Sequence, residues 1–383
     1  MQRLIAQFIA GGLIAVAGAA SAAGFNPEPC AQILERGIAD RAFPGCTVVV
    51  GTGDRILWSA AFGHHDYSGQ ARVTPAAIYD LASVTKVAGT TAVFMRLVAL
   101  GKVKLTDPGG QYLPEFIAAA PTPEERRQRE QMTVEHLLTH SAGLVAWKAY
   151  YKSASSYEAM LRAIYATPLE TAPGERVRYS DCGMILAGEI AARAGGKPLA
   201  DLEREWIFQP LRMRDTLRNP PASLAARIPP TEIEAATGRA VHGVVHDENA
   251  RAAEGITRHA GLFATAEDLA RLAQELLRAL DGRSEHFPRA VVTDFFTGRA
   301  IGKNSVRGIG WGIAQGEPGQ RARVVSHNGF TGTYLQLDLE HQRFVVLLTN
   351  RVHPTRDNDK LGRVRREFVV VARRMHAIGE QHH

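Results

Sequence analysis

Ser83-Val84-Thr85-Lys86 places a hydroxyl and an amine three residues apart, directly after a short apolar, strand-like run. Apolar residues recur at helical spacing from Val84 to Leu100, and Gly101 ends the pattern, so a helix is predicted to begin at the serine. Side chains three residues apart share a helix face, which lets the Lys86 amine reach the Ser83 oxygen. A serine held in this way can act as a nucleophile once a neighbouring base takes its proton.

The same four residues have a simpler interpretation when they are taken alone. A serine often caps a helix, and a lysine three residues later often lies on the solvated face. Other segments of the chain are therefore needed to distinguish a helix-capping role for Ser83 from a nucleophilic one.

Outward from this quartet, the chain divides into β-rich ends and a helical middle. The β-rich runs cover residues 47–50, 55–62, 323–326, 333–337 and 344–349, and the first two are joined by a hairpin turn at 51–54. Helical patterns cover residues 134–138, 157–165, 184–194, 202–208, 266–280 and 361–378. These patterns predict an α/β (α+β) fold, in which an antiparallel sheet built from both chain ends is flanked by helices and carries an inserted, mostly helical domain. We expect the sheet domain in residues 24–105 and 285–383 and the helical domain in residues 106–284.

The first 23 residues have the composition of a secretory signal. Arg3 precedes an apolar stretch from Leu4 to Ala20, and the small residues of 21–24 follow as a cleavage site. An uncleaved anchor is the alternative, although the stretch is short and rich in alanine for a membrane span. We therefore expect a secreted, periplasmic protein that is not inserted in the membrane once the signal has been removed.

Charge and cysteine content exclude some classes of protein. The formal net charge of the 383 residues is +6, but the basic residues are spread along the chain, so we predict no nucleic acid partner. Three cysteines do not make a disulfide scaffold. At most one bridge can form, and Cys30 with Cys46 is the favoured pair because both lie near the start. Cys182 is then expected to be a small buried residue rather than a nucleophile.

Three further segments match one known pattern in the right order. Residues 136–144 read His-Leu-Leu-Thr-His-Ser-Ala-Gly-Leu, Tyr179-Ser180-Asp181 follows a Pro-Gly-Glu turn, and residues 327–333 read His-Asn-Gly-Phe-Thr-Gly-Thr. Together with Ser83 and Lys86, they resemble the serine β-lactamase and penicillin-binding protein family, in particular its class C and DD-peptidase branch. The resemblance covers nearly the whole chain after residue 23.

This resemblance implies a role for each matching residue. Ser83 would form an acyl-enzyme, while Lys86 and Tyr179 would share the proton transfer. The backbone N–H groups of Ser83 and Phe330 would stabilise the oxyanion. The remaining expected substrate-binding positions are Asp181, His327 and Gly329.

Two of these positions depart from the family pattern. Asp181 stands where many relatives have Asn, and a carboxylate there would keep Lys86 in its ammonium form and shift proton transfer to Tyr179. His327 replaces the lysine of true β-lactamases, which removes a permanent positive charge that would bind a β-lactam carboxylate. This replacement favours a peptidase, amidase or esterase.

A cluster of histidines and acids raises the alternative of a metal site. The residues are His136 and His140 at helical spacing and, further along, His242, His246, Asp247, Glu248 and His259. No third ligand is fixed for the first pair, and the second group resembles a loop that borders the site in the same family. We predict no metal, and no phosphate cradle or dinucleotide motif points to a cofactor.

The expected function is that of a serine hydrolase acting on an amide or ester, with a cell-wall peptide as the favoured small-molecule or peptide substrate. A carboxylesterase or a weak β-lactamase on the same scaffold is the alternative enzyme. From another class, a penicillin-sensing or peptidoglycan-binding module would acylate once without turnover. The sequence indicates no oligomeric state.

Overall fold

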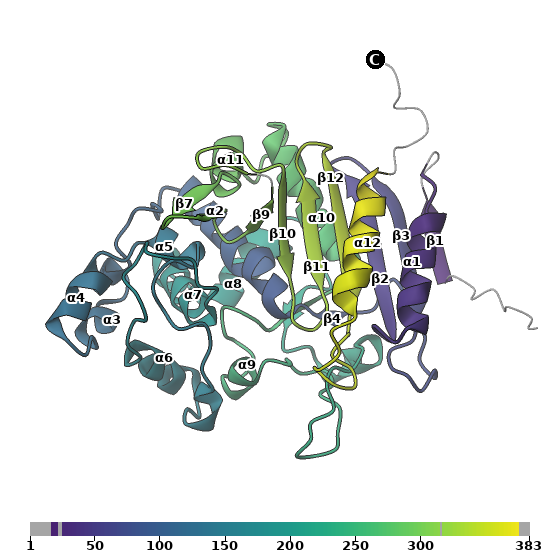
Figure 1. Cartoon of the computed structure of the whole chain (residues 1–383), viewed down its shortest axis with the longest axis horizontal. Helices are drawn as coiled ribbons and strands as arrows, with labels where there is room; N and C mark the ends of the chain where they lie inside the picture. Colours follow the sequence, from purple (N-terminus) through teal and green to yellow (C-terminus); the bar gives the residue numbers. More distant parts are fainter. Residues whose placement is uncertain (1–16, 22–24, 315, 375–383) are drawn as a thin grey trace, which may run out of the picture.

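A seven-stranded antiparallel sheet forms the backbone of the molecule and draws its strands from both chain ends (Figure 1). The computed structural model describes residues 17–21, 25–314 and 316–374. The strand order in the sheet is β1-β3-β2-β12-β11-β10-β9. The bounds of these strands are Ala17–Ser21 (β1), Gly45–Thr52 (β2), Ile56–Gly63 (β3), Gly312–Ala314 (β9), Val324–Asn328 (β10), Tyr334–Asp338 (β11) and Arg343–Thr349 (β12). The predicted fold class is confirmed.

The two chain ends meet in the middle of the sheet, where β2 pairs with β12 and Val49 lies opposite Val346. Every residue of β12 is buried. Alternate side chains of a strand point to opposite faces, so both faces of the sheet must be covered. Helices α1 (Glu28–Ala39) and α12 (Leu361–Arg374) pack against each other beside the sheet, and their buried apolar residues form a core with β2, β3 and β12. Helix α10 (Ala266–Leu280) packs against β2 and β12 and belongs to the other core.

The middle of the chain supplies most of the remaining helices, which lie beside the β9 edge of the sheet (Figure 1). The α-helices are α2 (Ala92–Ala99), α3 (Pro114–Ala118), α4 (Pro123–Glu130), α5 (Val134–Leu138), α6 (Tyr157–Tyr165), α7 (Asp181–Gly195), α8 (Leu199–Glu203), α9 (Glu248–Ala252) and α11 (Arg289–Phe295). Shorter strands are β4 (Tyr79–Asp80), β5 (Leu217–Arg218), β6 (Leu262–Ala264), β7 (Arg299–Ile301) and β8 (Ser305–Arg307). Short 3₁₀-helices span Ala82–Val84, Gly109–Gln111, Tyr150–Lys152 and Ala222–Arg227, and two π-helical segments span Lys86–Thr91 and Arg204–Phe208.

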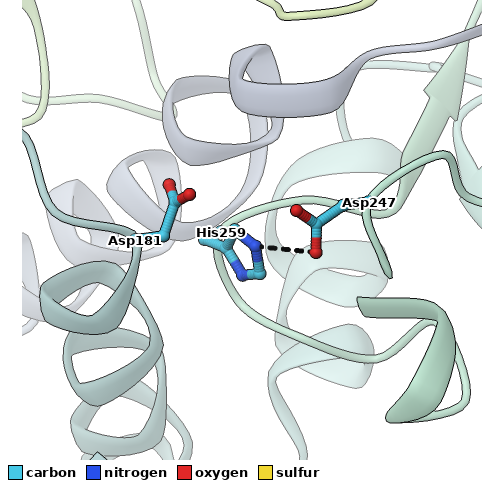
Figure 2. Close-up of side chains that lie close together, drawn as sticks. All are labelled: Asp181, Asp247 and His259. Carbon is cyan, nitrogen blue, oxygen red and sulfur yellow. Dashed lines mark hydrogen bonds and ion pairs between the residues drawn. The ribbon is translucent and has the colours of Figure 1, made fainter. Parts of the chain in front are cut away.

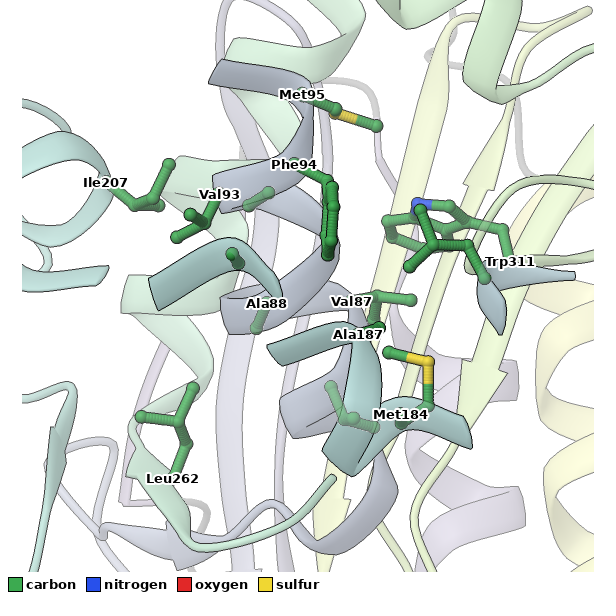
Figure 3. Packing of buried hydrophobic residues seen from close by; sticks show 14 of the residues in the cluster. Val87, Ala88, Val93, Phe94, Met95, Met184, Ala187, Ile207, Leu262 and Trp311 are labelled. Atoms are coloured by element: carbon green, nitrogen blue, oxygen red, sulfur yellow. The ribbon is translucent and has the colours of Figure 1, made fainter. Parts of the chain in front are cut away.

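The segment that carries Ser83 runs through the larger core. Apolar side chains from this segment, from α7 and from the sheet side pack around it (Figure 3), including Val87, Val93, Phe94, Met184 and Trp311. All five are 1% exposed or less. Close packing of this kind fixes the position of the helix that follows Ser83.

The predicted single helix over 84–100 is wrong in its detail. A 3₁₀ turn is followed by the π-helix Lys86–Thr91 and only then by α2. The apolar stripe of a sequence does not distinguish these forms, because the same residues can be buried in each. Within the π-helix, a side chain on Gly89 would place its Cβ 2.3 Å from the Oε1 of Glu203, which is fully buried. A tertiary contact therefore requires glycine at this point of the helix.

Two predictions about the N-terminal region need comment. The predicted signal, residues 1–23, lies largely outside the described residues, but its segment Ala17–Ser21 forms β1 at the edge of the sheet. Cys30 and Cys46, the pair that the sequence favours if a bridge forms, are not bridged in this structure, since all three cysteines are free and buried. Burial raises the pKa of the Cys30 thiol to about 12 and that of Cys46 as well, so both pack as small apolar side chains. Among the described residues, no helix combines the length and the apolar character needed to cross a bilayer.

Candidate active site

Ser83 and Lys86 meet as the sequence predicts. The Lys86 Nζ donates a hydrogen bond of 2.8 Å to the Ser83 Oγ. It donates a second one of 3.0 Å to the backbone oxygen of His259, and it lies 2.8 Å from the Oδ1 of Asp181. The last contact is an ion pair. Three acceptor atoms thus surround an ammonium group that is fully buried.

The turn before Ser83 is held by buried polar contacts. Ala82 has a φ of +45°, a left-handed conformation that strains a residue with a Cβ. The Asp80 carboxylate stabilises this turn, because its Oδ1 accepts a hydrogen bond from the Ala82 N–H and its Oδ2 accepts one from the His246 N–H. From the sheet side, the hydroxyls of Thr331 and Thr333 each donate a 2.8 Å hydrogen bond to the backbone oxygens of Asp80 and Leu81. These contacts fix the serine against the turn that follows β10.

The charge state of Lys86 follows from its surroundings. Burial lowers the pKa of Lys86, but the electrostatic and hydrogen-bond interactions with Asp181 first and Tyr179 second outweigh burial, so the net shift is upward. Lys86 is therefore an ammonium ion at neutral pH. This agrees with the expectation that a carboxylate at position 181 keeps Lys86 in its ammonium form.

Asp181, Asp247 and His259 lie close together (Figure 2) and offer ligand atoms within 4.8 Å of one another. The His259 Nε2 is already engaged with the Asp247 Oδ1 at 3.1 Å, and the Asp181 Oδ1 is paired with Lys86. Burial raises the pKa of Asp247, but the charge and hydrogen bond of His259 outweigh burial and bring it down to about 2. The Lys86 ammonium group therefore lies beside this cluster, and His259 supplies the backbone carbonyl that binds Lys86.

Tyr179 lies over the same ammonium group, with Lys86 Nζ 5.1 Å from its ring centroid. Its ring stacks on His140 at 4.4 Å between centroids and lies 6.0 Å from the ring of His327. His140 also accepts a hydrogen bond from the Ser180 N–H at its Nδ1, which fixes the segment that carries Tyr179. Tyr179 is 40% exposed, so a substrate can reach its phenol.

The backbone N–H groups that the resemblance assigns to the oxyanion belong to residues that border one cavity. The N–H groups of Ser83 and Phe330 have no hydrogen-bond partner in the part of the chain that the structure describes, and both residues line one cavity. Gly329 shapes this corner, because a Cβ there would lie 1.9 Å from the Thr333 Oγ1 and 2.5 Å from the Leu81 oxygen. Two free donors aimed at one space can stabilise a developing oxyanion.

His327 reaches the site but does not bring a positive charge. It is 6% exposed, and its Nδ1 contacts the Asn328 backbone oxygen at 2.9 Å. Burial, followed by the charge of Lys86, lowers the pKa of His327 to about 3. The imidazole is neutral at pH 7 and can only serve as a polar group.

The cavity that these residues form has a volume of about 350 Å³. Three large exposed aromatic rings, from Trp147, Tyr179 and Phe330, line it together with Ser83. Its other lining residues include Asp181, Asp247, Glu248, His246, His259 and Arg356. A pocket with an apolar rim and a few polar groups beside a nucleophile suits a small organic substrate.

The sequence did not reveal every residue that contributes. From the sequence, His140, Asp247 and His259 had no role apart from the rejected metal site. In the structure His140 contacts Tyr179, the His259 carbonyl binds Lys86, and Asp247 holds the His259 ring. His136 lies apart from this role, since its Nδ1 accepts a hydrogen bond from the Thr133 N–H in a helix capping box. The only sequence signal for them was their place in family-like segments.

A serine held by a buried lysine, a nearby phenol and two free backbone donors defines a serine hydrolase of the acyl-transfer class. The chain belongs to the family described as Beta-lactamase, whose sequence profile matches residues 30–369.

Relatives and solved structures support this assignment. The chain is 30% identical over 382 residues to a protein named "Putative D-alanyl-D-alanine carboxypeptidase" from Escherichia coli (strain K12), covering 88% of this chain and 86% of that protein. It is 29% identical over 360 residues to "N-acetylmuramyl-L-alanine amidase" from Bacillus subtilis (strain 168), covering 84% and 80%. A class C beta lactamase from Rhodobacter sphaeroides has the same fold, with a TM-score of 0.69, 20% identity and coverage of 90% and 99%. The hydrolase EstCE1 does so with a TM-score of 0.70, 21% identity and coverage of 87% and 97%.

Proposed function

We propose that the protein is a secreted hydrolase that acylates Ser83 and cleaves an amide or ester of cell-wall peptide origin. The observation that carries this proposal is the Lys86 ammonium, which donates to the Ser83 Oγ at 2.8 Å while Asp181 and the His259 carbonyl hold it. A lysine that only stabilised the fold would not need a serine hydroxyl among its hydrogen-bond acceptors. A buried cation placed against a hydroxyl oxygen supports nucleophilic attack.

The proton path follows from the charge of Lys86. Since its nitrogen already carries three protons, it cannot accept the proton of Ser83 in the resting state. Tyr179 is the remaining group, and its ring centroid lies 5.1 Å from the ammonium nitrogen. The phenolate form of Tyr179 takes the proton as the Ser83 Oγ bonds to the carbonyl carbon, and the phenol so formed returns that proton to the leaving nitrogen or oxygen as the acyl-enzyme forms.

The carbonyl oxygen gains negative charge in this step. The N–H groups of Ser83 and Phe330 would bind that oxygen, and each such donor is typically worth about 10²–10³ in rate. Water then attacks the acyl-enzyme and releases the product. Neither step requires a cofactor.

The substrate class is supported by the relatives and by the cavity. Two relatives of about 30% identity carry names that refer to D-alanyl-D-alanine and to an N-acetylmuramyl-L-alanine bond, which are both amides. Trp147 and Phe330 offer aromatic surface to a peptide or sugar ring at the mouth of the cavity. A signal over residues 1–23 would deliver the protein to the periplasm, where such peptides occur.

Turnover of three probes by the purified protein tests the proposal. A muropeptide mixture, a chromogenic ester and a β-lactam are incubated with the parent protein, with Ser83→Ala and with the control Ser68→Ala, which changes an exposed loop serine. We expect continued release of peptide product by the parent and Ser68→Ala only. Release by Ser83→Ala at the parent rate contradicts the assignment, and a single stoichiometric burst in the parent indicates a sensing module.

A further inference from the structure

Arg351 lies two residues beyond the end of strand β12 and contacts the residue that supplies one of the two oxyanion donors. Its Nε donates a hydrogen bond of 3.0 Å to the backbone oxygen of Phe330. Its guanidinium carbon lies 4.7 Å from the centroid of the Phe330 ring, which is a cation–π contact. One side chain thus holds Phe330 by its backbone and by its ring.

The peptide group that contains the Phe330 N–H is fixed at its other end. In a trans peptide the N–H and C=O bonds point in opposite directions. The carbonyl of this peptide group belongs to Gly329, and it accepts a hydrogen bond of 3.1 Å from the Gly332 N–H. The next carbonyl along the chain is that of Phe330 itself, which Arg351 binds. The two carbonyls that flank Phe330 are therefore both held, one from within the turn and one by a side chain from outside it.

Arg351 is itself anchored to a second segment of backbone. Its Nη1 donates hydrogen bonds of 2.9 Å and 2.7 Å to the backbone oxygens of Arg356 and Asn358. The Asn358 amide in turn donates a hydrogen bond of 3.2 Å to the Arg351 oxygen. A guanidinium is planar, so the directions of its N–H groups are fixed relative to one another. Arg351 therefore bridges the loop of residues 351–358 and the oxyanion turn, residues 329–333.

The oxyanion turn also packs directly on the stem of Arg351. Gly332 has a φ of +114°, and a Cβ there would lie 2.8 Å from the Arg351 Cγ and 2.2 Å from the Thr349 Oγ1. The Thr349 hydroxyl donates a hydrogen bond of 3.1 Å to the Gly332 oxygen. Contacts this close leave little room for the turn to move independently of the side chain at position 351.

We propose that Arg351 is a positioning residue for the reaction, which aims the Phe330 N–H at the developing oxyanion. Arg351 does not line the cavity, so it acts through Phe330 and not on the substrate. An oxyanion donor stabilises the transition state only when it points to the place that the charged oxygen will occupy. The inference rests on the proposed function, because it assumes acyl transfer to Ser83.

Two esters that differ in one atom test the inference. 4-Nitrophenyl phenylacetate and its thionoester, in which sulfur replaces the carbonyl oxygen, release the same nitrophenol. Sulfur accepts hydrogen bonds more weakly than oxygen, so the thionoester gains less from the two N–H donors. We expect the parent protein to prefer the oxygen ester by about 10²-fold or more in kcat/KM for acylation, after correction for the uncatalysed rates. A parent protein without this preference overturns the inference.

Arg351→Met assigns part of this preference to the guanidinium group. Methionine keeps an apolar stem and removes the three hydrogen bonds to backbone oxygens. The variant should cleave the oxygen ester about 10- to 100-fold more slowly and the thionoester much less so, because the Phe330 N–H no longer points at the oxyanion. A purely structural role would slow both esters by the same factor. An equal effect on both esters, or no effect, in the folded variant therefore overturns the inference.

A charge-conserving variant and a matched control complete the set. Arg351→Lys keeps the positive charge but has one nitrogen in place of the planar fork, so it should restore only part of the preference. Full recovery by lysine would show that charge alone suffices and would overturn the positioning role. Arg365→Met is the control, since Arg365 in α12 also lies over an aromatic ring, that of Tyr334 at 5.1 Å, and it should keep the parent preference. Thermal unfolding shows which variants are folded, and if Arg351→Met is not, an unchanged preference in Arg351→Lys still overturns the inference.

The two proposals fail in different ways. If the parent releases nitrophenol from neither ester and Ser83 stays unmodified, the proposed function is wrong. If the parent cleaves both esters through Ser83 with the expected preference, and folded Arg351→Met keeps that preference, the hydrolase stands and only the positioning role is wrong.

Discussion

Replacing Asp181 by Asn tests the division of labour between Lys86 and Tyr179. Asp181 and Tyr179 together keep the pKa of the fully buried Lys86 raised against the opposing effect of burial. An amide in place of the carboxylate leaves burial as the dominant influence. The pKa of Lys86 should then fall, and the minor fraction of chains that hold a neutral amine beside the Ser83 Oγ should rise.

The size of the effect follows from the ion pair. Two unit charges 4 Å apart interact by about 4 kcal/mol at an effective dielectric constant near 20. The Asp181 side chain is 19% exposed, so solvent screens part of this energy, and we use about 2 kcal/mol. That energy corresponds to roughly 30-fold in the ratio of neutral to charged Lys86.

A double-mutant cycle measures this coupling through single-turnover acylation rates at pH 7. In the parent background, Tyr179→Phe removes the group that accepts the proton and should cost about 10²–10⁴ in rate. In the Asp181→Asn background, the neutral Lys86 amine can replace the phenol, so the cost of Tyr179→Phe should shrink by roughly 30-fold. Glu248→Gln is the control background. Glu248 lines the same cavity but pairs with Arg356 at 2.6 Å.

Additivity would refute the reasoning. If Tyr179→Phe costs the same factor in all three backgrounds, the charge of Lys86 does not decide which group moves the proton. If the cost also shrinks in Glu248→Gln, the effect comes from the general field of the cavity rather than from the ion pair.

Three further predictions concern geometry and stability. Gly329→Ala should reduce the acylation rate by about 10²–10³ with Ser83 intact, because the added Cβ would push the turn away from Thr333 and displace the Phe330 N–H. Single-turnover kinetics measure this rate, and an unchanged rate would show that the turn adjusts to the added Cβ. Burial lowers the pKa of His327 from 6.5 to about 3, so the unfolded chain binds this proton first as the pH falls, and the free energy of unfolding decreases below pH 6.5, by about 2 kcal/mol at pH 5. Urea unfolding should show a smaller change in this free energy between pH 7 and 5 for His327→Gln than for the parent, and an equal change would contradict the burial argument. Glu203 and Arg218 form a buried ion pair, and Arg218 holds two carbonyls of the loop that binds Lys86. Glu203→Ala should therefore lower the free energy of unfolding by about 3–5 kcal/mol, and Glu203→Met combined with Arg218→Met should recover most of this loss. Full additivity of the two changes would argue against a buried pair.

The sheet and several helices could be predicted because their residues repeat with a clear period. The bounds of α6 and α10 agree with the patterns over 157–165 and 266–280, and β12 lies at the run over 344–349. The burial period of the two helices and the continuous apolar run of β12 are local properties of the sequence. The π-helix after Lys86 could not be predicted, since Gly89 is needed there by Glu203, over a hundred residues away.

The active site likewise combines residues that short sequence segments predict with contacts that only the folded chain reveals. Ser83, Lys86 and Tyr179 were predictable from short segments that resemble one family, in the right order along the chain. The contacts of Asp247 with His259 and of His259 with Lys86 join segments that only the fold brings together.

Intact-protein mass spectrometry with a fluorophosphonate tests the central claim most directly, namely that the Ser83 oxygen attacks with Lys86 as its cationic partner and Tyr179 as its base. The account predicts one phosphonyl group per chain, located by peptide mapping on Ser83, absent in Ser83→Ala and formed much more slowly in Tyr179→Phe. A phosphonyl group on another residue, or labelling of Ser83→Ala at the parent rate, would contradict it.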